Sequence, residues 1–387
     1  MTVTMTPEPF RPEFDPAEVE DLRQRLVATR LRLPEETGWE RGTPSSWLLQ
    51  LVEDWQKFDA EAFAAELLHL EHRMVVAGGR PLLHLVVSEG QGPRPLPLVL
   101  THGWPGSFLE YLDLLPLLTD PAASGADAAD SFTVVVPSLP GYGFSAAPPP
   151  GGFSADEIAR LWHRLMHDGL GFERYVAHGS DLGASVTARL ARAHPEAILG
   201  IHLATPGLAP APTPWSSEEE SYAAQAETWM AEEGGYGHEH GTKPLTLAAA
   251  LSDSPVGLGA WIGEKVFSWS STTSEGDPNF KRERLLETLT LYWLTGTIAT
   301  SFLPYWNYRH NPLSALPTDD PCHVPTTVSL FGGERVPFPK PPRKLGDRYF
   351  TIVGWEEHDR GGHFPAVAEP GLLAESLRKS FRPLREA

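Results

Sequence analysis

The first part of the chain carries apolar residues at helical spacing. One stripe within residues 16–30 predicts an amphipathic helix. It consists of Val19, Leu22, Leu26 and Val27. A second helical stretch, rich in aromatic residues, contains Trp47, Leu51 and Trp55. The pattern therefore predicts a helical N-terminal extension, which we place at residues 1–75.

Short apolar runs then replace the helical pattern. Residues 74–76 and 82–87 are typical of strands, and the Gly78-Gly79 pair between them of a tight turn. Farther along, short apolar strands alternate with helices. The expected strands are 96–100, 132–136, 175–177 and 198–203, and the expected helices include 158–166 and 184–193. This alternation predicts a mostly parallel sheet with helices on both faces.

The alternation is interrupted once. A proline-rich segment at residues 209–214 is followed by a helical region, to about residue 305, that is rich in Trp, Tyr and Gly. Strands resume at 326–331 and 349–353, and a C-terminal helix starts near Leu372. We therefore expect a two-part core with an inserted helical cap. The expected divisions are 1–75 (N-terminal extension), 76–208 (first part of the core), 209–305 (cap) and 306–387 (second part of the core).

Composition excludes several classes of protein. The chain has 387 residues, enough for a large core with insertions, and a formal charge of −19, which disfavours nucleic acids and anionic membranes as partners. Its single cysteine, Cys322, excludes a disulfide or a thiolate metal cluster within one chain. There is no apolar run of about 18 residues and no signal-peptide core in residues 1–14. We expect a cytoplasmic protein that does not enter a membrane.

One segment has the pattern of a nucleophile elbow. Residues 178–183 read His-Gly-Ser-Asp-Leu-Gly and lie between an expected strand and an expected helix. An elbow needs small residues two positions before and after the nucleophile, because its turn is strained and crowded. Centred on Asp181 these are Gly179 and Gly183, whereas centred on Ser180 they would be bulky. The spacing favours Asp181 as the nucleophile of an α/β-hydrolase fold over an aspartate that simply caps a turn.

The base and acid of a triad are expected after later strands. His363, in Arg-Gly-Gly-His-Phe-Pro, lies between the last expected strand and the last helix, as the histidine of this fold does. Glu334, in Phe-Gly-Gly-Glu, follows the preceding strand and leaves space for a helix and a strand before His363. We favour Glu334 as the acid, with Asp359, from the same loop as His363, as the alternative.

A loop after an early strand is the candidate oxyanion hole. Residues 102–106 read His-Gly-Trp-Pro-Gly, and this fold places one oxyanion-hole amide there. We assign the hole to the backbone amides of Trp104 and Leu182. The aromatic side chains expected to contact substrate are Trp104, Phe108 and Trp269, although each could equally be a core residue.

Two other motifs are weak. Gly141-Tyr142-Gly143 lacks the third glycine of a dinucleotide-binding loop. His238-Glu239-His240 has no third ligand at a familiar spacing, and we interpret it as a solvated loop. We expect no cofactor and no metal.

Taken together, these motifs resemble those of the microsomal-type epoxide hydrolases over nearly the whole chain. The resemblance is carried by residues 102–107 (HGWPGS), 251–257 (LSDSPVG) and 360–364 (RGGHF), and by an N-terminal stretch with Trp39 and Trp55. It implies two cap tyrosines that hold the epoxide oxygen. These match Tyr236 and Tyr305, with Tyr308 as an alternative to the second. Ser180 and Leu182 depart from the Gly and Trp that often flank the nucleophile in this family.

The resemblance implies an enzyme that opens a small apolar epoxide with water to a vicinal diol, through a covalent ester on Asp181. The alternatives are an epoxide-cyclising biosynthetic enzyme, a haloalkane dehalogenase and a non-catalytic binding protein. The elbow spacing argues against a serine esterase. The physiological epoxide, the enantiomer and the oligomeric state stay open.

Overall fold

The structure is a computed structural model, and it describes residues 5–34, 38–209, 212–273, 278–311 and 316–385. One nine-stranded sheet runs through these residues in the order β1-β2-β3-β5-β4-β6-β7-β8-β9. The strands are β1 (Pro7–Pro9), β2 (Glu71–Ala77), β3 (Arg80–Ser88), β4 (Leu96–Thr101), β5 (Phe132–Pro137), β6 (Tyr175–Ser180), β7 (Ile198–Ala204), β8 (Cys322–Gly332) and β9 (Phe350–Gly361).

Most of the sheet is parallel, which confirms the expected fold class. The pairs β4–β5, β4–β6, β6–β7, β7–β8 and β8–β9 are parallel. The pairs at the β1 end, from β1 to β5, are antiparallel. Because the parallel strands share one direction, the loops at their carboxyl ends meet along one edge, where an open α/β sheet forms its binding site.

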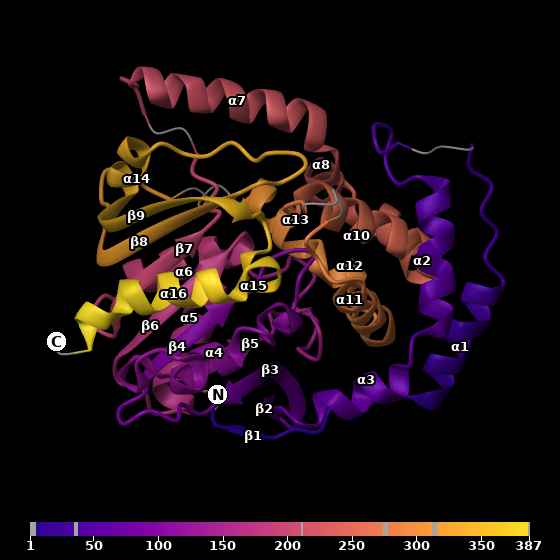
Figure 1. Cartoon of the computed structure of the whole chain (residues 1–387), viewed down its shortest axis with the longest axis horizontal. Coiled ribbons are helices and arrows are strands. Elements are labelled where there is room, and N and C mark those ends of the chain that lie inside the picture. The colour runs from indigo at the N-terminus through magenta and orange to yellow at the C-terminus, as the bar shows by residue number, and fades with distance from the viewer. Residues whose placement is uncertain (1–4, 35–37, 210–211, 274–277, 312–315, 386–387) are drawn as a thin grey trace.

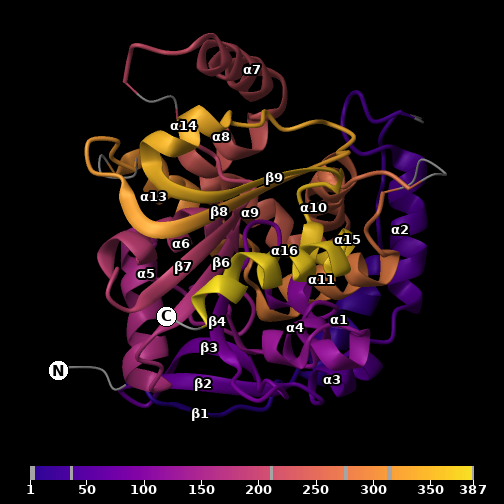
Figure 2. The ribbon, with the colours of Figure 1, turned by 60° about the vertical axis from the view of Figure 1, so that its left-hand side comes forward.

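Helices cover both faces of the sheet (Figures 1 and 2). Along β5, Val135 packs into the same cluster as α5 (Ala155–Arg164) and α6 (Leu182–Ala193), and Val134 into the cluster of α4 (Leu115–Thr119) and α16 (Pro370–Phe381). Neighbouring side chains of a strand point to opposite faces, so a continuous apolar run is what a strand between two helical layers requires.

The expected insertion between β7 and β8 is helical. Its helices are α7 (Ser217–Glu233), α8 (Gly235–Thr242), α9 (Pro244–Asp253), α10 (Pro255–Trp269), α11 (Arg282–Thr295), α12 (Ile298–Ser301) and α13 (Leu303–His310). Residues 210–211 of the expected boundary segment lie outside the described residues, and α13 continues past residue 305. The bounds of the cap stay a prediction.

The N-terminal helices pack against this insertion (Figure 1). They are α1 (Pro16–Val27), α2 (Ser45–Lys57) and α3 (Ala60–Leu67), and they contact α10 and α11. One buried bond joins them, from the indole Nε1 of Trp55 to Thr290 Oγ1 at 2.9 Å. The expected first boundary, at residue 75, falls inside β2, so the N-terminal segment also supplies strands to the common sheet.

Short elements complete the chain. They are α14 (Arg343–Tyr349), α15 (Pro365–Ala368), the 3-10 turns η1 (Phe108–Tyr111), η2 (Pro121–Ser124), η3 (Ala128–Asp130) and η5 (Arg382–Leu384), and a π-helical turn, η4 (Leu165–Gly169). The helix expected over residues 158–166 ends in that π turn.

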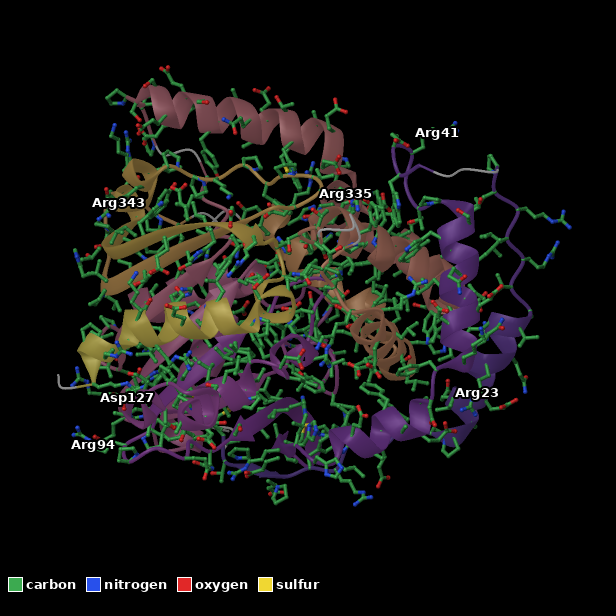
Figure 3. All side chains as sticks on the ribbon, in the orientation of Figure 1. Arg23, Arg41, Arg94, Asp127, Arg335 and Arg343 are labelled. Atoms are coloured by element: carbon green, nitrogen blue, oxygen red, sulfur yellow. The ribbon has the colours of Figure 1, made fainter. Side chains whose placement is uncertain are left out.

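Charged side chains lie mainly outside the two apolar clusters. Arg94, Asp127 and Arg343 are exposed and lie at the edge of the molecule in Figure 3. Among the described residues, no single helix is long and apolar enough to cross a membrane. Helices α9 and α10 meet that criterion only as a pair, with a bend of 119° between them.

Candidate active site

The turn from β6 to α6 carries Asp181 in a strained conformation. Its φ of 54° and ψ of −124° are unusual for a residue other than glycine. A Cβ atom at position 179 would lie 2.1 Å from the carbonyl oxygen of Gly183, and one at position 183 would lie 2.0 Å from that of Thr101. The backbone passes so closely here that both positions require glycine, which is the physical basis of the elbow spacing.

The two carboxylate oxygens of Asp181 have different partners. Oδ1 accepts a hydrogen bond from the backbone N–H of Trp104 at 2.9 Å, and Oδ2 lies 3.5 Å from Nε2 of His363. Burial alone would raise the pKa of Asp181. His363 and the amides of Trp104 and Leu182 outweigh that effect and hold the pKa below its usual value. The carboxylate is therefore ionised at neutral pH, with one oxygen in the expected oxyanion hole and the other beside the histidine.

A buried histidine forms a hydrogen bond to the peptide group that carries the Trp104 N–H. Nε2 of His102 accepts the Leu139 N–H at 3.1 Å, so the neutral ring carries its proton on Nδ1, which donates to the Gly103 carbonyl at 3.0 Å. Burial lowers the pKa of His102 to about 4, which keeps the ring neutral at pH 7. The Gly103 carbonyl and the Trp104 N–H belong to one peptide unit, so this bond helps to aim the N–H at Asp181. The sequence pointed to the loop at residues 102–106, but it gave no role to His102.

His363 is held over Asp181 by a glycine turn after β9. Gly362 has φ 60°, and a Cβ there would lie 2.5 Å from the backbone nitrogen of Ser271. The His363 N–H donates to the Trp269 carbonyl at 2.9 Å, and its ring stacks on Phe338 with centroids 4.8 Å apart. Its Nδ1 is buried and has no hydrogen-bond partner among the described residues.

Of the two candidate acids, Glu334 is the one beside His363. Glu334 is buried, at 8% exposure, and lines the same cavity. Burial raises the pKa of Glu334, while the charges of His363 and Lys340 oppose that effect. Asp359 is exposed. The geometry favours Glu334 as the group that balances a positive charge on His363, by proximity rather than by a direct hydrogen bond.

Two cap tyrosines lie close to Asp181. Tyr236 of α8 and Tyr305 of α13 have ring centroids 5.9 Å apart at 77°. Burial and then the charge of Asp181 raise the pKa of Tyr236, and burial, Tyr236 and Asp181 raise that of Tyr305. A contact between the two hydroxyls lowers the pKa of Tyr236 and raises that of Tyr305. Tyr308, the alternative, is 59% exposed, so the geometry favours Tyr305.

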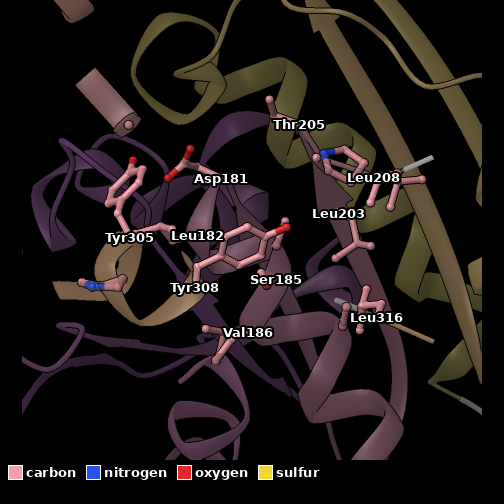
Figure 4. A pocket seen from close by; sticks show the side chains of 18 of the residues that line it. Asp181, Leu182, Ser185, Val186, Leu203, Thr205, Leu208, Tyr305, Tyr308 and Leu316 are labelled. Carbon is pink, nitrogen blue, oxygen red and sulfur yellow. The ribbon is translucent and has the colours of Figure 1, made fainter. Parts of the chain in front are cut away.

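A cavity of about 530 Å³ lies between the sheet and the cap. Its lining includes most of the expected site residues: Asp181, Leu182, Glu334, His363, Tyr236 and Tyr305. In Figure 4, Asp181 and Tyr305 lie to the left, and apolar side chains such as Leu208 and Leu316 lie to the right.

The three aromatic side chains expected to contact substrate do not line this cavity. Phe108 packs on the far side of its loop, against His72, His84 and Phe144, which removes it from the expected binding site. Trp104 and Trp269 are fully buried behind the reactive groups. Trp104 stacks on Tyr236 at 5.4 Å, and Trp269 lies 4.9 Å from the ring of His363. Their side chains support the site instead of forming its wall.

The interpretation of residues 238–240 as a solvated loop is wrong. They belong to α8, where His240 lies one turn after Tyr236 and is 0% exposed. The His240 ring stacks on Phe302 and lies 5.0 Å from Tyr305, and Trp261 donates to its Nε2 at 3.1 Å. The i, i+4 spacing from Tyr236 was a signal in the sequence, but it shows a shared face only once the helix is known.

The chain is similar to known proteins over nearly its whole length. Residues 7–111 match the family model described as the epoxide hydrolase N terminus, and residues 97–242 match that of the alpha/beta hydrolase fold. A putative epoxide hydrolase of Stigmatella aurantiaca is 39% identical over 97% of this chain and 85% of its own length. The chain belongs to the epoxide hydrolase family. Epoxide hydrolase 1 of Sus scrofa is 32% identical over 96% of this chain and 87% of its own.

Solved structures agree with this assignment. The juvenile hormone epoxide hydrolase of Bombyx mori has a TM-score of 0.85 at 27% identity, covering 98% of this chain and 95% of its own. The Aspergillus niger epoxide hydrolase has a TM-score of 0.82 at 29% identity, covering 99% and 97%. The expected family, fold and enzyme class, a hydrolase of the epoxide hydrolase type, are therefore confirmed. The individual roles of the site residues stay proposals.

Proposed function

We propose that this epoxide hydrolase opens an apolar epoxide in two covalent steps, and that the two oxygens of Asp181 have different roles. Oδ2 attacks the substrate, and Oδ1 carries the negative charge in the second step. In the first step Oδ2 attacks one ring carbon, and the bond from that carbon to the epoxide oxygen breaks. The oxygen takes a proton from Tyr236 or Tyr305, which leaves a β-hydroxyalkyl ester on Asp181 and a tyrosinate. The observation that carries this proposal is that Asp181 lines the cavity with one carboxylate oxygen on the Trp104 amide and the other beside His363.

In the second step His363 removes a proton from water, and the resulting hydroxide attacks Cγ of Asp181. The negative charge collects on Oδ1, where the amides of Trp104 and Leu182 stabilise it by about 3–4 kcal/mol per donor. The Cγ–Oδ2 bond then breaks, so Oδ2 leaves with the product, which takes the proton from His363 to become a vicinal diol. Asp181 is left as a carboxylic acid that contains one oxygen from water, and its proton, the second proton of that water, returns to the tyrosinate.

The cavity supports an apolar substrate. Its lining beyond Asp181 includes Leu203, Leu208, Leu316, Phe338 and Tyr349. Burying such a surface against an aryl or alkyl group is favourable by roughly 25 cal/mol per Å². Water is the second substrate, and it must reach the space between His363 and the Asp181 carboxyl.

A single turnover in H₂¹⁸O, with enzyme in excess over an aryl epoxide, tests this route. The scheme requires unlabelled diol in the first turnover and ¹⁸O in the peptide that contains Asp181. Asp181→Ala is expected to make no diol, and His363→Gln to accumulate the covalent adduct detected by intact mass. Label in the first-turnover diol would show that water attacks the substrate directly, and would overturn the two-step scheme.

Haloalkane dehalogenation is the second candidate, because the indole N–H groups of Trp104 and Trp269 are buried without a partner among the described residues and could in principle hold a halide. Neither side chain lines the cavity, whereas two tyrosine hydroxyls face Asp181. Epoxide opening therefore fits better. Chloride release from chloroalkanes at a rate comparable to diol formation would favour the alternative.

A further inference from the structure

Two histidines and a glutamate meet at the end of α6 that is remote from Asp181. His163 lies in the last turn of α5, His194 directly follows α6, and Glu196 precedes β7. Asp181 and His194 flank the 12 residues of α6, so 194 − 181 = 13 steps of 1.5 Å place them about 20 Å apart. The proposed reaction uses none of these three groups.

Their geometry brings three ligand types together. One ligand atom from each of His163, His194 and Glu196 lies within 4.8 Å of the others. The two imidazole rings are parallel within 7°, with centroids 3.6 Å apart. Nδ1 of His194 lies 3.6 Å from Glu196 Oε1, and its Nε2 is buried with no hydrogen-bond partner among the described residues. A buried ring nitrogen without a partner needs an explanation, because such groups are normally satisfied.

The surroundings of His163 suit a ligand. Its Nδ1 is 3.2 Å from the hydroxyl of Tyr175, a contact that orients the ring and directs Nε2 away from that strand. This contact leaves Nε2 as the ring nitrogen of His163 that is available to a ligand.

The backbone at this point is irregular. α5 passes into the π-helical turn Leu165–Gly169, which contains His167, and the ring of His167 lies 5.2 Å from that of His163. The π turn ends α5, and it places His167 on the same side as His163. Nδ1 of His167 contacts Asp168 at 2.9 Å, so a third imidazole and a second carboxylate border the cluster.

We propose that His163, His194 and Glu196 form a binding site for a divalent transition-metal ion such as Zn²⁺, which joins α5 to the turn between α6 and β7. Two imidazoles and a carboxylate are a ligand set that Zn²⁺ accepts, with water in the remaining position, and Tyr175 acts behind His163. The site is separate from the catalytic one and would stabilise the fold.

Binding requires the stack of the two imidazole rings to open. Tetrahedral Zn²⁺ with bonds of about 2.0–2.1 Å places ligand atoms about 3.3 Å apart, closer than the present limit of 4.8 Å. A metal lies in the plane of each ring that binds it, so one of the two stacked rings must turn. His194 can turn at Nε2 without losing a hydrogen bond described there, and the side chain of Glu196 is 69% exposed.

Titration of the full-length protein with Zn²⁺, followed by calorimetry and by thermal unfolding, tests the proposal, with Mg²⁺ as the metal control. We expect one ion per chain at pH 7.5, and a rise in Tm of about 2–4 °C at a hundredfold excess over Kd. His194→Ala should weaken binding at least about tenfold and abolish the shift in Tm. His69→Ala, a change at an exposed histidine after α3, should behave as wild type.

Glu196→Gln is the second variant, because its exposed side chain can change without affecting folding. It should weaken Zn²⁺ binding while leaving Tm in metal-free buffer unchanged. Diol formation by the wild type should be the same with and without bound Zn²⁺. Absence of a saturable site, or equal Zn²⁺ affinity in the wild type, His194→Ala and Glu196→Gln, would overturn the proposal.

Discussion

On the sheet side of the cavity, Asp181, Trp104 and His363 are held by backbone contacts, whereas on the cap side Tyr236 and Tyr305 are held by aromatic packing. The sheet side depends on glycines with no room for a Cβ and on peptide groups aimed at one carboxylate. The cap side depends on rings of Trp104, Trp269 and His240 that surround the tyrosines. The sheet-side residues are therefore fixed by close backbone contacts that leave no room for a Cβ, and the cap tyrosines by the packing of neighbouring rings. We therefore expect added side-chain atoms to be tolerated less well on the sheet side than on the cap side.

The largest effect is expected on the cap side, when both acids are removed together. Tyr236→Phe with Tyr305→Phe should slow alkylation of Asp181 by about 10⁴-fold, because the ring oxygen then leaves as an alkoxide without a donor. Each single variant should lose about 10²-fold, since one tyrosine still donates. Tyr236→Phe should be the more damaging, because burial raises the pKa of both tyrosines and the contact between them offsets part of that rise only at Tyr236.

Single-turnover mass spectrometry of the adduct measures this effect. Tyr308→Phe is the matched control, and with an exposed side chain it should change the rate little. A larger loss of alkylation rate in Tyr308→Phe than in Tyr305→Phe would show that Tyr308, and not Tyr305, is the second proton donor.

A matched pair of glycine substitutions compares the two sides directly. In Gly103→Ala the new Cβ would lie 2.4 Å from Oδ1 of Asp181, so the Trp104 amide must move away and kcat should fall by about 10²–10³-fold. Gly235→Ala, beside Tyr236, meets nothing within 4 Å and should keep nearly full activity. Steady-state kinetics with circular dichroism as a folding check measures both. Equal losses would show that the cap is as sterically constrained as the elbow.

Glu334→Gln should lower the activity without lowering the stability of the fold. Removing the charge near His363 should slow hydrolysis of the adduct by about 10²-fold, while Asp359→Asn should have no such effect. Burial raises the folded-state pKa of Glu334, so the folded protein loses stability as pH rises from the unfolded value toward the folded one. Glu334→Gln should therefore match or exceed the wild-type Tm at pH 8. A loss of Tm there, with activity retained, would contradict the proposed role.

The smallest effect is expected at Glu110, in the turn below the Trp104 loop. Burial, with the charge of Asp181, raises its pKa from 4.5 to about 8. The carboxyl is thus protonated in the fold at neutral pH, and stability falls as pH rises between these two values. The Tm advantage of Glu110→Gln over the wild type should grow from pH 5 to pH 9 in thermal scans. Glu232→Gln, exposed on α7, should show no such trend.

The sequence predicted the site best where a residue is positioned by neighbours in the same local turn, because their distance then follows from their separation along the chain. The elbow glycines, the glycines before His363 and the Trp104 loop all lie within a few residues of the groups they position. The choice between Glu334 and Asp359 was different, because Glu334 follows β8 and Asp359 lies in β9, and only the packing of the two strands decides which carboxylate is buried at the cavity and which is exposed. Likewise Phe108 and Trp269 were recognised as aromatic, yet their side chains do not line the cavity.

The sequence by itself was enough to predict the parallel core, the helical insertion into it, the family and the glycine spacing of the elbow, because each rests on periodicity or on a local motif. The tertiary structure decided that Tyr305 and not Tyr308 faces Tyr236, that His240 is buried beside both reactive tyrosines, and that His163 meets His194 across two helices. These contacts join residues that share no local pattern. Which of them meet depends on how whole helices pack, and that is settled by the summed burial of many side chains and not by any one segment.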